Sequence, residues 1–287
     1  MIFIFISLLL SNIFIFTIAY SLTKRINYPF IYEKNNFAEV ALLGVTFVCI
    51  IGLILNFFIP LSKFFNTLLI IFFLIIYLAY CLKENKIIQC KYLLFASIIS
   101  FLIICSNNIY RPDAGLYHLP FISILNENKI LIGLSNLHFR FGHISIIQYG
   151  SAIFNNHIFG NEGILILPSL LFSYFFILCF GFILRVINLN KKFKKHNSKL
   201  FFFINGVFIY FLYKMNNYNN FGNDVPGHIF VFYIIFLFIK NKDKFTKSSF
   251  SKIFYFSIFA LLVKNTLILV FFLFLFIPIK FLIKQFN

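Results

Sequence analysis

The sequence predicts an all-α protein, a polytopic transmembrane helical bundle with eight or nine spans. Three observations carry this prediction. The 287-residue chain is 61% hydrophobic and only 11% charged, and a water-soluble domain cannot hide that much apolar surface. Its apolar residues form repeated runs of roughly twenty, the length that a helix needs to cross a bilayer. Lys and Arg gather in the short connections between these runs.

Each apolar run predicts one crossing. In chain order we expect spans over 2–21, 38–59, 66–82, 88–105, 163–187, 198–214 and 225–240. The last run, 253–285, would be about 50 Å long as a helix and so exceeds one crossing. The polar "KNT" at 264–266 predicts that it breaks there into a tight hairpin. The whole chain, 1–287, is predicted to be a single integral membrane domain, either complete or a fragment of a longer protein.

The charge distribution predicts the orientation of these spans. Connections 22–37, 83–91, 188–199 and 240–252 carry sixteen Lys and Arg residues, against five in the alternate connections. The positive-inside rule makes the first group cytoplasmic, which places the N-terminus, 106–162 and 215–224 outside. Residues 2–21 lack a positive n-region and an A-x-A-like end, so they are expected to be an uncleaved span.

Composition and motifs argue against nucleic-acid binding, an ATP-driven pump, a zinc protease and a serine hydrolase. The formal charge of +17 does not indicate nucleic-acid binding, because the lysines lie where the positive-inside rule puts them. The five cysteines are scattered without metal-ligand spacing and predict structural thiols. No phosphate-binding glycine loop, H-E-x-x-H or G-x-S-x-G motif is present. The sequence therefore predicts no cofactor.

One connection differs from the others in length and pattern. Residues 107–162 form a 56-residue connection in which apolar periodicity is interrupted by polar groups. Its stretches "LYHLPFISILNEN" and "ISIIQYGSAIFNNHIF" predict amphipathic helices parallel to the membrane face. Long connections with internal structure are usually functional.

The first candidate site residues lie at the start of this connection, in "RPDAGLYHLPF". Asp113 is a candidate general base at the boundary between lipid and water. The alternative is that it is only the N-cap of a helix over 114–127. Tyr117, four residues on, is predicted to share its helical face, and His118 is a second candidate catalytic residue.

Two further stretches supply candidate substrate-binding residues. "NLHFRFGH" contains His138, Arg140 and His143, and the planar fork of an arginine is suited to phosphate; the alternative is an interfacial loop whose cations meet lipid head groups. Asp224, in the connection "NNFGNDVPGH", is a candidate second carboxylate that would face Asp113; the alternative is that this stretch, rich in Asn, Gly and Pro, is only a turn. Lys264 is a cation within an apolar run, which either marks a site or extends to the interface.

The segment "RPDAGLYHLPFISILNENKILIGLSNLHFRFG" resembles the signature of a family of uncharacterised bacterial multispanning membrane proteins. That family is in turn similar to the GT-C glycosyltransferases, which use polyprenyl-phosphate-linked sugars. In GT-C enzymes a large outer loop carries an acidic motif near the end of a span and two membrane-parallel helices. Asp113 and the 107–162 connection resemble that arrangement, although the GT-C loop usually follows the first span.

The resemblance implies inverting sugar transfer at the outer face of the bacterial inner (plasma) membrane. Asp113 would take a proton from the acceptor hydroxyl, and Arg140 or Lys264 would stabilise the departing polyprenyl phosphate. The GT-C motif is often a pair of adjacent carboxylates, whereas Ala114 follows Asp113 here, which favours a single base over a divalent metal. The implied partners are membrane lipid and a polyprenyl-phosphate-linked sugar.

Three other functions stay open. An O-antigen-type polymerase or ligase also has many spans and a large outer loop, and would depend on Arg and His. A transporter or lipid-flipping protein would carry polar residues in several spans, whereas these spans are nearly all apolar. A non-enzymatic remnant of a longer gene is the third alternative.

Overall fold

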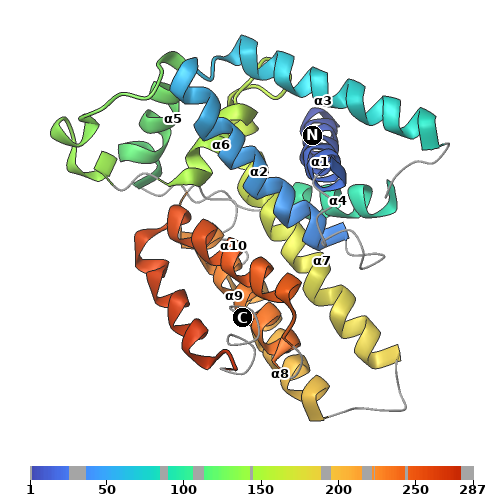
Figure 1. The fold of residues 1–287 in the computed structure, drawn as a ribbon. Helices are drawn as coiled ribbons and strands as arrows, with labels where there is room; N and C mark the ends of the chain where they lie inside the picture. The colour runs from blue at the N-terminus through green and yellow to red at the C-terminus, as the bar shows by residue number, and fades with distance from the viewer. Residues whose placement is uncertain are drawn as a thin grey trace. The chain divides into compact units, whose positions relative to one another are not determined.

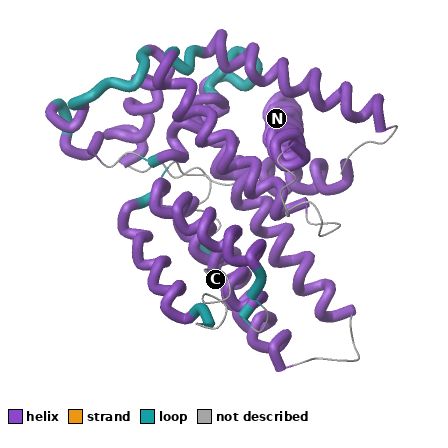
Figure 2. The backbone as a smooth tube through the Cα atoms, viewed as in Figure 1, coloured by secondary structure: helices purple, strands orange, loops and turns teal. Residues whose placement is uncertain are grey.

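The computed structural model describes residues 2–25, 37–84, 90–105, 113–142, 145–188, 195–214, 222, 224–242 and 245–278. Helices joined by loops make up these ranges, and within them the only β-type pairing is an isolated bridge between Asn156 and Gly160. Figures 1 and 2 show this all-helical architecture. The predicted all-α class is confirmed.

Each predicted span corresponds to a helix. The long helices are α1 (Ile2–Arg25), α2 (Phe37–Phe58), α3 (Lys63–Glu84), α4 (Cys90–Cys105), α7 (Ile166–Asn188), α8 (Lys195–Tyr213), α9 (Asp224–Asn241) and α10 (Lys247–Val263). Shorter helical pieces lie between α4 and α7.

The predicted break in the last apolar run is confirmed. Helix α10 ends at Val263, and a 3₁₀ helix, η6 (Asn265–Phe276), follows Lys264. Phe250 and Phe254, early in α10, both pack edge-on against Phe274, late in η6. The two segments therefore run antiparallel, as a hairpin does.

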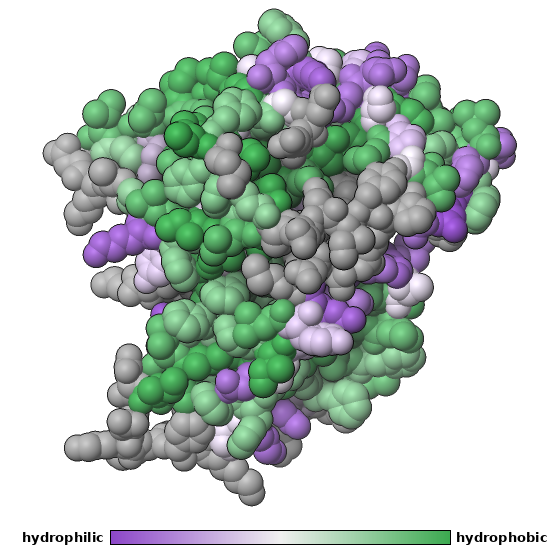
Figure 3. All heavy atoms as spheres, turned by 180° about the vertical axis from the view of Figure 1, so that it is seen from behind, coloured by the Kyte–Doolittle hydropathy of each residue, from purple (hydrophilic) through white to green (hydrophobic). Residues whose placement is uncertain are grey.

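Within the described residues, five helices are long and apolar enough to cross a membrane: Ile2–Thr23, Phe37–Phe58, Lys63–Leu82, Gly163–Ile187 and Asp224–Asn241. Cys90–Cys105, Ser198–Tyr213 and Asn265–Phe276 are shorter apolar helices. The apolar window of α3 is only 11% buried within the protein, so most of its side chains need a hydrocarbon environment. Apolar side chains also cover much of the face in Figure 3. The number of eight or nine crossings stays a prediction.

The chain divides into two compact units. Unit 1 contains Met1–Leu178 and Lys214–Gly222, and unit 2 contains Cys179–Tyr213 and Asn223–Asn287. In unit 1, α1 packs against α2, α3 and α4. In unit 2, α9 packs against α8, α10 and η6.

A buried polar clamp joins three helices of unit 1. Asn12 of α1 donates through Nδ2 to the backbone oxygen of Leu93 in α4 (2.8 Å), and its Oδ1 accepts from the Tyr174 hydroxyl of α7 (2.7 Å). Lipid offers no hydrogen-bond partner to such polar side chains, so they bond to other helices inside the protein. Asn12 therefore fixes α1 against both neighbours.

The segment between α4 and α7 folds onto the ends of α2 and α3. It contains η1 (Ala114–His118), α5 (Leu119–Glu127), η2 (Leu134–Asn136), η3 (Phe139–Gly142), α6 (Ile146–Phe154) and η4 (Asn161–Leu165). Helix α5 is amphipathic as predicted, burying Phe121, Ile122 and Leu125 while exposing Ser123 and Glu127.

Helix α6 differs from the prediction of an amphipathic surface helix, because all nine of its residues are buried. It packs against α2 at distances that only glycine permits. A Cβ atom on Gly150 would lie 2.6 Å from the Cys49 Sγ, and one on Gly52 would lie 2.8 Å from the Tyr149 backbone oxygen. Burial raises the pKa of the Tyr149 phenol, which stays neutral. The apolar pattern of this helix thus reflects burial, not contact with a membrane face.

Buried asparagines attach α5 and α6 to the turn between α2 and α3. Asn56 donates to the backbone oxygens of Leu125 (3.2 Å) and Asn128 (3.0 Å). Asn66 donates to the backbone oxygen of Ala152 (2.9 Å). These carbonyls lie in the last turns of α5 and α6 or just after, where the regular i→i−4 donors run out. The asparagine side chains supply additional donors and hold the segment in place.

Candidate functional site

The candidate site begins at a π-helical turn, η1, which follows Asp113 and runs directly into α5. Pro120 lies in the first turn of α5 and has no N–H to donate to the preceding turn. The Leu119 N–H bonds instead to the Ala114 oxygen, five residues back. Such π turns recur at functional sites.

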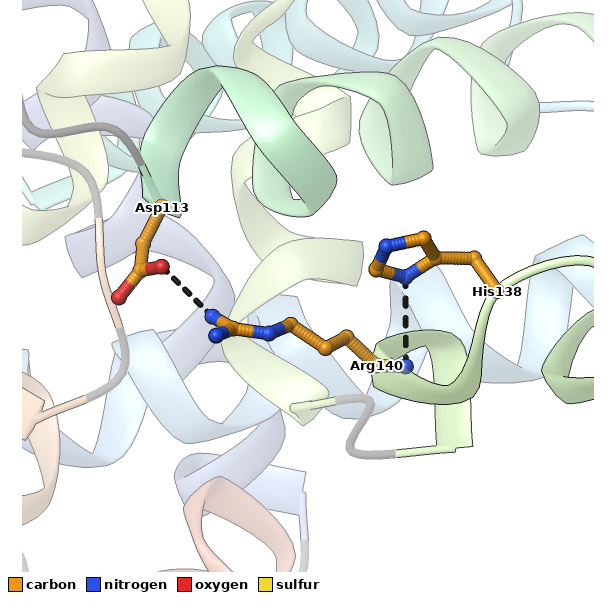
Figure 4. Close-up of polar contacts among 3 residues, drawn as sticks. All are labelled: Asp113, His138 and Arg140. Atoms are coloured by element: carbon orange, nitrogen blue, oxygen red, sulfur yellow. Dashed lines mark hydrogen bonds and ion pairs between the residues drawn. The ribbon is translucent and has the colours of Figure 1, made fainter.

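Asp113 occupies the N-cap position of η1, but its side chain does not cap the helix. Its backbone is already helical (φ −59°, ψ −33°) and its side chain makes no capping hydrogen bond, whereas an N-cap residue usually has extended backbone. The carboxylate is therefore available for another partner. The carboxylate points away from the helix end towards another loop (Figure 4).

The Asp113 carboxylate forms an ion pair with Arg140. Arg140 Nη1 donates to Asp113 Oδ1 at 2.6 Å, across 27 positions of sequence. The side chains are 38% exposed for Arg140 and 56% exposed for Asp113. The pair is thus accessible from solvent, and the remaining N–H groups of the guanidinium add donors in the same plane.

Aromatic rings hold the guanidinium of Arg140. Its Cζ lies 5.1 Å from the centre of the Tyr117 ring and 5.7 Å from that of Phe139. Both distances fall within the range of cation–π attraction. The prediction that Tyr117 lies beside Asp113 therefore has a counterpart in the structure: both contact the same arginine.

Two histidines contact residues of this cluster: His138 contacts Arg140, and His118 contacts Tyr117. The His138 Nδ1 accepts from the Arg140 backbone N–H at 3.3 Å (Figure 4). His118 is only 4% exposed, its ring lies 4.1 Å from that of Tyr117, and its Nδ1 is 2.9 Å from Gln148 Nε2.

The amide of Gln148 defines which nitrogen of His118 carries the proton. Gln148 Oε1 accepts from the Ser145 backbone N–H at 2.9 Å, as part of the capping box of α6. The amide nitrogen must then face His118, so Nδ1 accepts and the proton lies on Nε2. The capping box therefore orients a neutral His118 beneath Tyr117.

The last two candidate residues that the structure describes belong to unit 2. Lys264 Nζ contacts Asp224 Oδ1 at 2.5 Å, with the side chains 40% and 65% exposed. This contact joins the first turn of α9 to the break between α10 and η6. Asp113 belongs to unit 1, so its pairing with Asp224 stays a prediction. His143 lies outside the described residues.

The structure thus brings five predicted residues into one cluster: Asp113, Tyr117, His118, His138 and Arg140. Sequence reasoning missed Gln148 and the asparagines that position this cluster. Their signal was available, because each is an amide in an apolar stretch. No group of three His, Cys, Asp or Glu side chains in the described part of the chain is arranged to hold a metal ion.

The cluster around Asp113 and Arg140 combines a carboxylate that can accept a proton with a planar cation that can bind an anion. The comparisons with known proteins add a family but no activity. A family model described as a domain of unknown function (DUF8201) matches residues 1–287, so the chain belongs to that family. No curated protein and no solved structure matches the chain.

Proposed function

We propose that this member of the DUF8201 family is a membrane glycosyltransferase of GT-C-like type. It transfers a sugar from a polyprenyl-phosphate donor to a cell-envelope acceptor. The reaction takes place at the outer face of a bacterial inner membrane, with the N-terminus outside. The observation that carries the proposal is the contact between Asp113 and Arg140 in a segment that connects apolar helices.

The proposed reaction uses the two partners of the ion pair in different roles. The acceptor hydroxyl oxygen attacks the anomeric carbon, and Asp113 takes the hydroxyl proton. The bond from that carbon to the phosphate oxygen breaks, and its electron pair leaves with the polyprenyl phosphate. Arg140 stabilises the charge that develops there. One proton and one leaving group are thus accounted for.

This mechanism requires the ion pair to open. In an inverting displacement the nucleophile and the leaving group lie on opposite faces of the sugar carbon, so a base and a phosphate ligand 2.6 Å apart must separate to admit it. Both side chains are more than a third exposed, and an exposed pair stabilises a protein by only about 0–1 kcal/mol. The phosphate of the donor then replaces the carboxylate as the partner of Arg140.

The other residues of the cluster have supporting roles in this proposal. Tyr117 and Phe139 keep the guanidinium in place when the carboxylate moves away. His118 is buried with its Nδ1 engaged by Gln148, so we assign it to positioning Tyr117. Of the two candidate cations, we assign the phosphate to Arg140, because it contacts the proposed base Asp113 directly.

The test is a transfer assay with Asp113→Asn. Membranes carrying the protein are supplied with a radiolabelled polyprenyl-phosphate sugar, and label in envelope polymer is measured. The amide cannot accept the proton, so transfer should fall by about 10²-fold or more. Glu127→Gln is the matched control, because Glu127 is an exposed carboxylate on α5 that contacts Ser123; this variant should transfer normally.

Wild-type transfer by Asp113→Asn at normal protein levels would exclude the base role. The comparison with Arg140→Ala separates the proposal from an O-antigen-type polymerase or ligase. If only the arginine variant loses glycan assembly, the cation-dependent alternative replaces this one.

A further inference from the structure

Residues 131–139 expose large apolar side chains although they belong to no apolar helix. Ile132 is 99% exposed, Leu137 80%, Phe139 69% and Leu131 46%. This stretch, which we term the apolar tip, projects as a loop beyond α5 (Figure 1). Exposed apolar groups this close together indicate a surface that is covered in the working protein.

The backbone of the apolar tip is held in one conformation. Gly133 has a left-handed backbone (φ 88°), and its oxygen accepts from the Asn136 N–H at 2.9 Å. Leu134, inside this turn, is only 8% exposed. The turn therefore buries Leu134 but holds the apolar side chains of Ile132 and Leu137 in an exposed position.

The base of the apolar tip is attached at the end of a candidate membrane span. The Ile130 N–H bonds to the Asn56 backbone oxygen (3.1 Å), and Asn56 Nδ2 bonds to the Asn128 oxygen (3.0 Å). Asn56 lies in the last turn of α2, one of the five helices able to cross a bilayer. The tip therefore starts at the end of a candidate membrane span.

Charges flank the apolar tip on both sides. Lys129 precedes it and is exposed, and Arg140 follows it. Cations beside an apolar group are the pattern of a segment that places apolar side chains in acyl chains and its charges among lipid phosphates. A protein partner would not require this position at the end of a span.

We propose that the apolar tip inserts into the membrane leaflet on the side of the α2–α3 turn. Ile132, Leu137 and Phe139 enter the acyl-chain region, and Arg140 lies at the level of the lipid phosphates. The inference rests on the geometry of unit 1 and does not require sugar transfer. If both hold, the Asp113–Arg140 pair meets the phosphate of a lipid-linked donor without drawing it out of the leaflet.

The chain contains no tryptophan, so a single introduced tryptophan is an unambiguous reporter of depth. Ile132→Trp and Leu137→Trp are reconstituted into vesicles of phosphatidylethanolamine and phosphatidylglycerol that contain phosphatidylcholine brominated along its acyl chains. Phe72→Trp, 57% exposed within α3, is the control for acyl-chain depth. Glu127→Trp, on the exposed face of α5, is the control for water.

We expect both tip reporters to resemble Phe72→Trp, with emission shifted to shorter wavelength, quenched by the brominated lipid and protected from aqueous acrylamide. Quenching by acrylamide without quenching by bromine overturns the proposal. Protection from both quenchers also overturns it, because the tip is then covered by protein. The measurement needs no transfer activity, so an inactive protein with a quenched tip rejects the glycosyltransferase and retains the membrane contact.

Discussion

The two units each contain an exposed acid–cation pair, and the pairs differ in their surroundings. Arg140 and Asp113 in unit 1 lie 2.6 Å apart, and Lys264 and Asp224 in unit 2 lie 2.5 Å apart, with comparable exposure. Around Arg140, two aromatic rings and a histidine fix the cation and its backbone. The Lys264 contact instead joins the start of α9 to a helix break.

This difference distinguishes a candidate site in unit 1 from a contact between two segments of unit 2. A guanidinium held over rings presents a fixed fork of donors to an anion, whereas a lysine ammonium is a flexible point charge. The backbone around Lys264 changes direction between α10 and η6, and Lys264 contacts Asp224 at that point. Distance and exposure alone would rank the two pairs as equal.

The largest difference between the two pairs is expected when the two cations are removed separately. Arg140→Ala should lower transfer about 10²–10³-fold, the effect of losing a donor to a developing charge. The transfer rate of Arg140→Lys should lie between those of the wild type and Arg140→Ala, because lysine keeps the positive charge but lacks the planar fork of donors. The radiolabel assay measures both, and a Lys264→Met loss as large as that of Arg140→Ala would reverse the assignment.

A matched pair of glycine substitutions tests how rigidly unit 1 is built. In Gly150→Ala the new methyl would meet Cys49 Sγ at 2.6 Å and Leu167 Cδ2 at 2.7 Å. Overpacking of this kind costs about 1–3 kcal/mol, so the Tm in detergent should fall. Gly206→Ala in α8 of unit 2 meets nothing within 4 Å and should leave the Tm unchanged or higher. Equal Tm values would contradict the close packing of α6.

The smallest effect is expected at the second pair itself. Asp224→Asn and Lys264→Met should each cost less than about 1 kcal/mol of stability, since exposed pairs contribute little. The double variant should resemble the single ones, and raised salt should reduce the difference from wild type. Thermal unfolding at two salt concentrations measures this, and a large drop in Tm would show that the helix break depends on the contact.

The sequence predicted most of the helices because their signal is local. Apolar runs and the polar residues at 264–266 predicted the long helices and the break at Lys264. It also selected Asp113, Tyr117 and Arg140, which the structure brings together. The partner of Asp113 could not be predicted, because 27 positions separate it from Arg140 and the path between them depends on Gly133 and the Asn56 contacts.

Helix α6 shows why one prediction was wrong. Apolar periodicity indicates that one face of a helix is covered, but it does not indicate whether lipid or protein covers it. In Ile146–Phe154 every residue is buried within the protein. The close approach of α6 to α2 depends on Gly52 and Gly150. Because glycine has no side chain, it does not contribute to the apolar periodicity from which the helix was predicted. Four of the five exposed large apolar side chains in the described part of this segment lie instead at 131–139, in a stretch without helical periodicity.

The winding of η6 has a consequence for how far a short apolar segment reaches. Its twelve residues form a 3₁₀ helix, and at about 2.0 Å per residue they extend roughly 24 Å. The same residues wound as an α-helix would extend about 18 Å. Against a hydrocarbon layer about 30 Å thick, tighter coiling lets a dozen residues cover most of a depth that ordinarily takes about twenty.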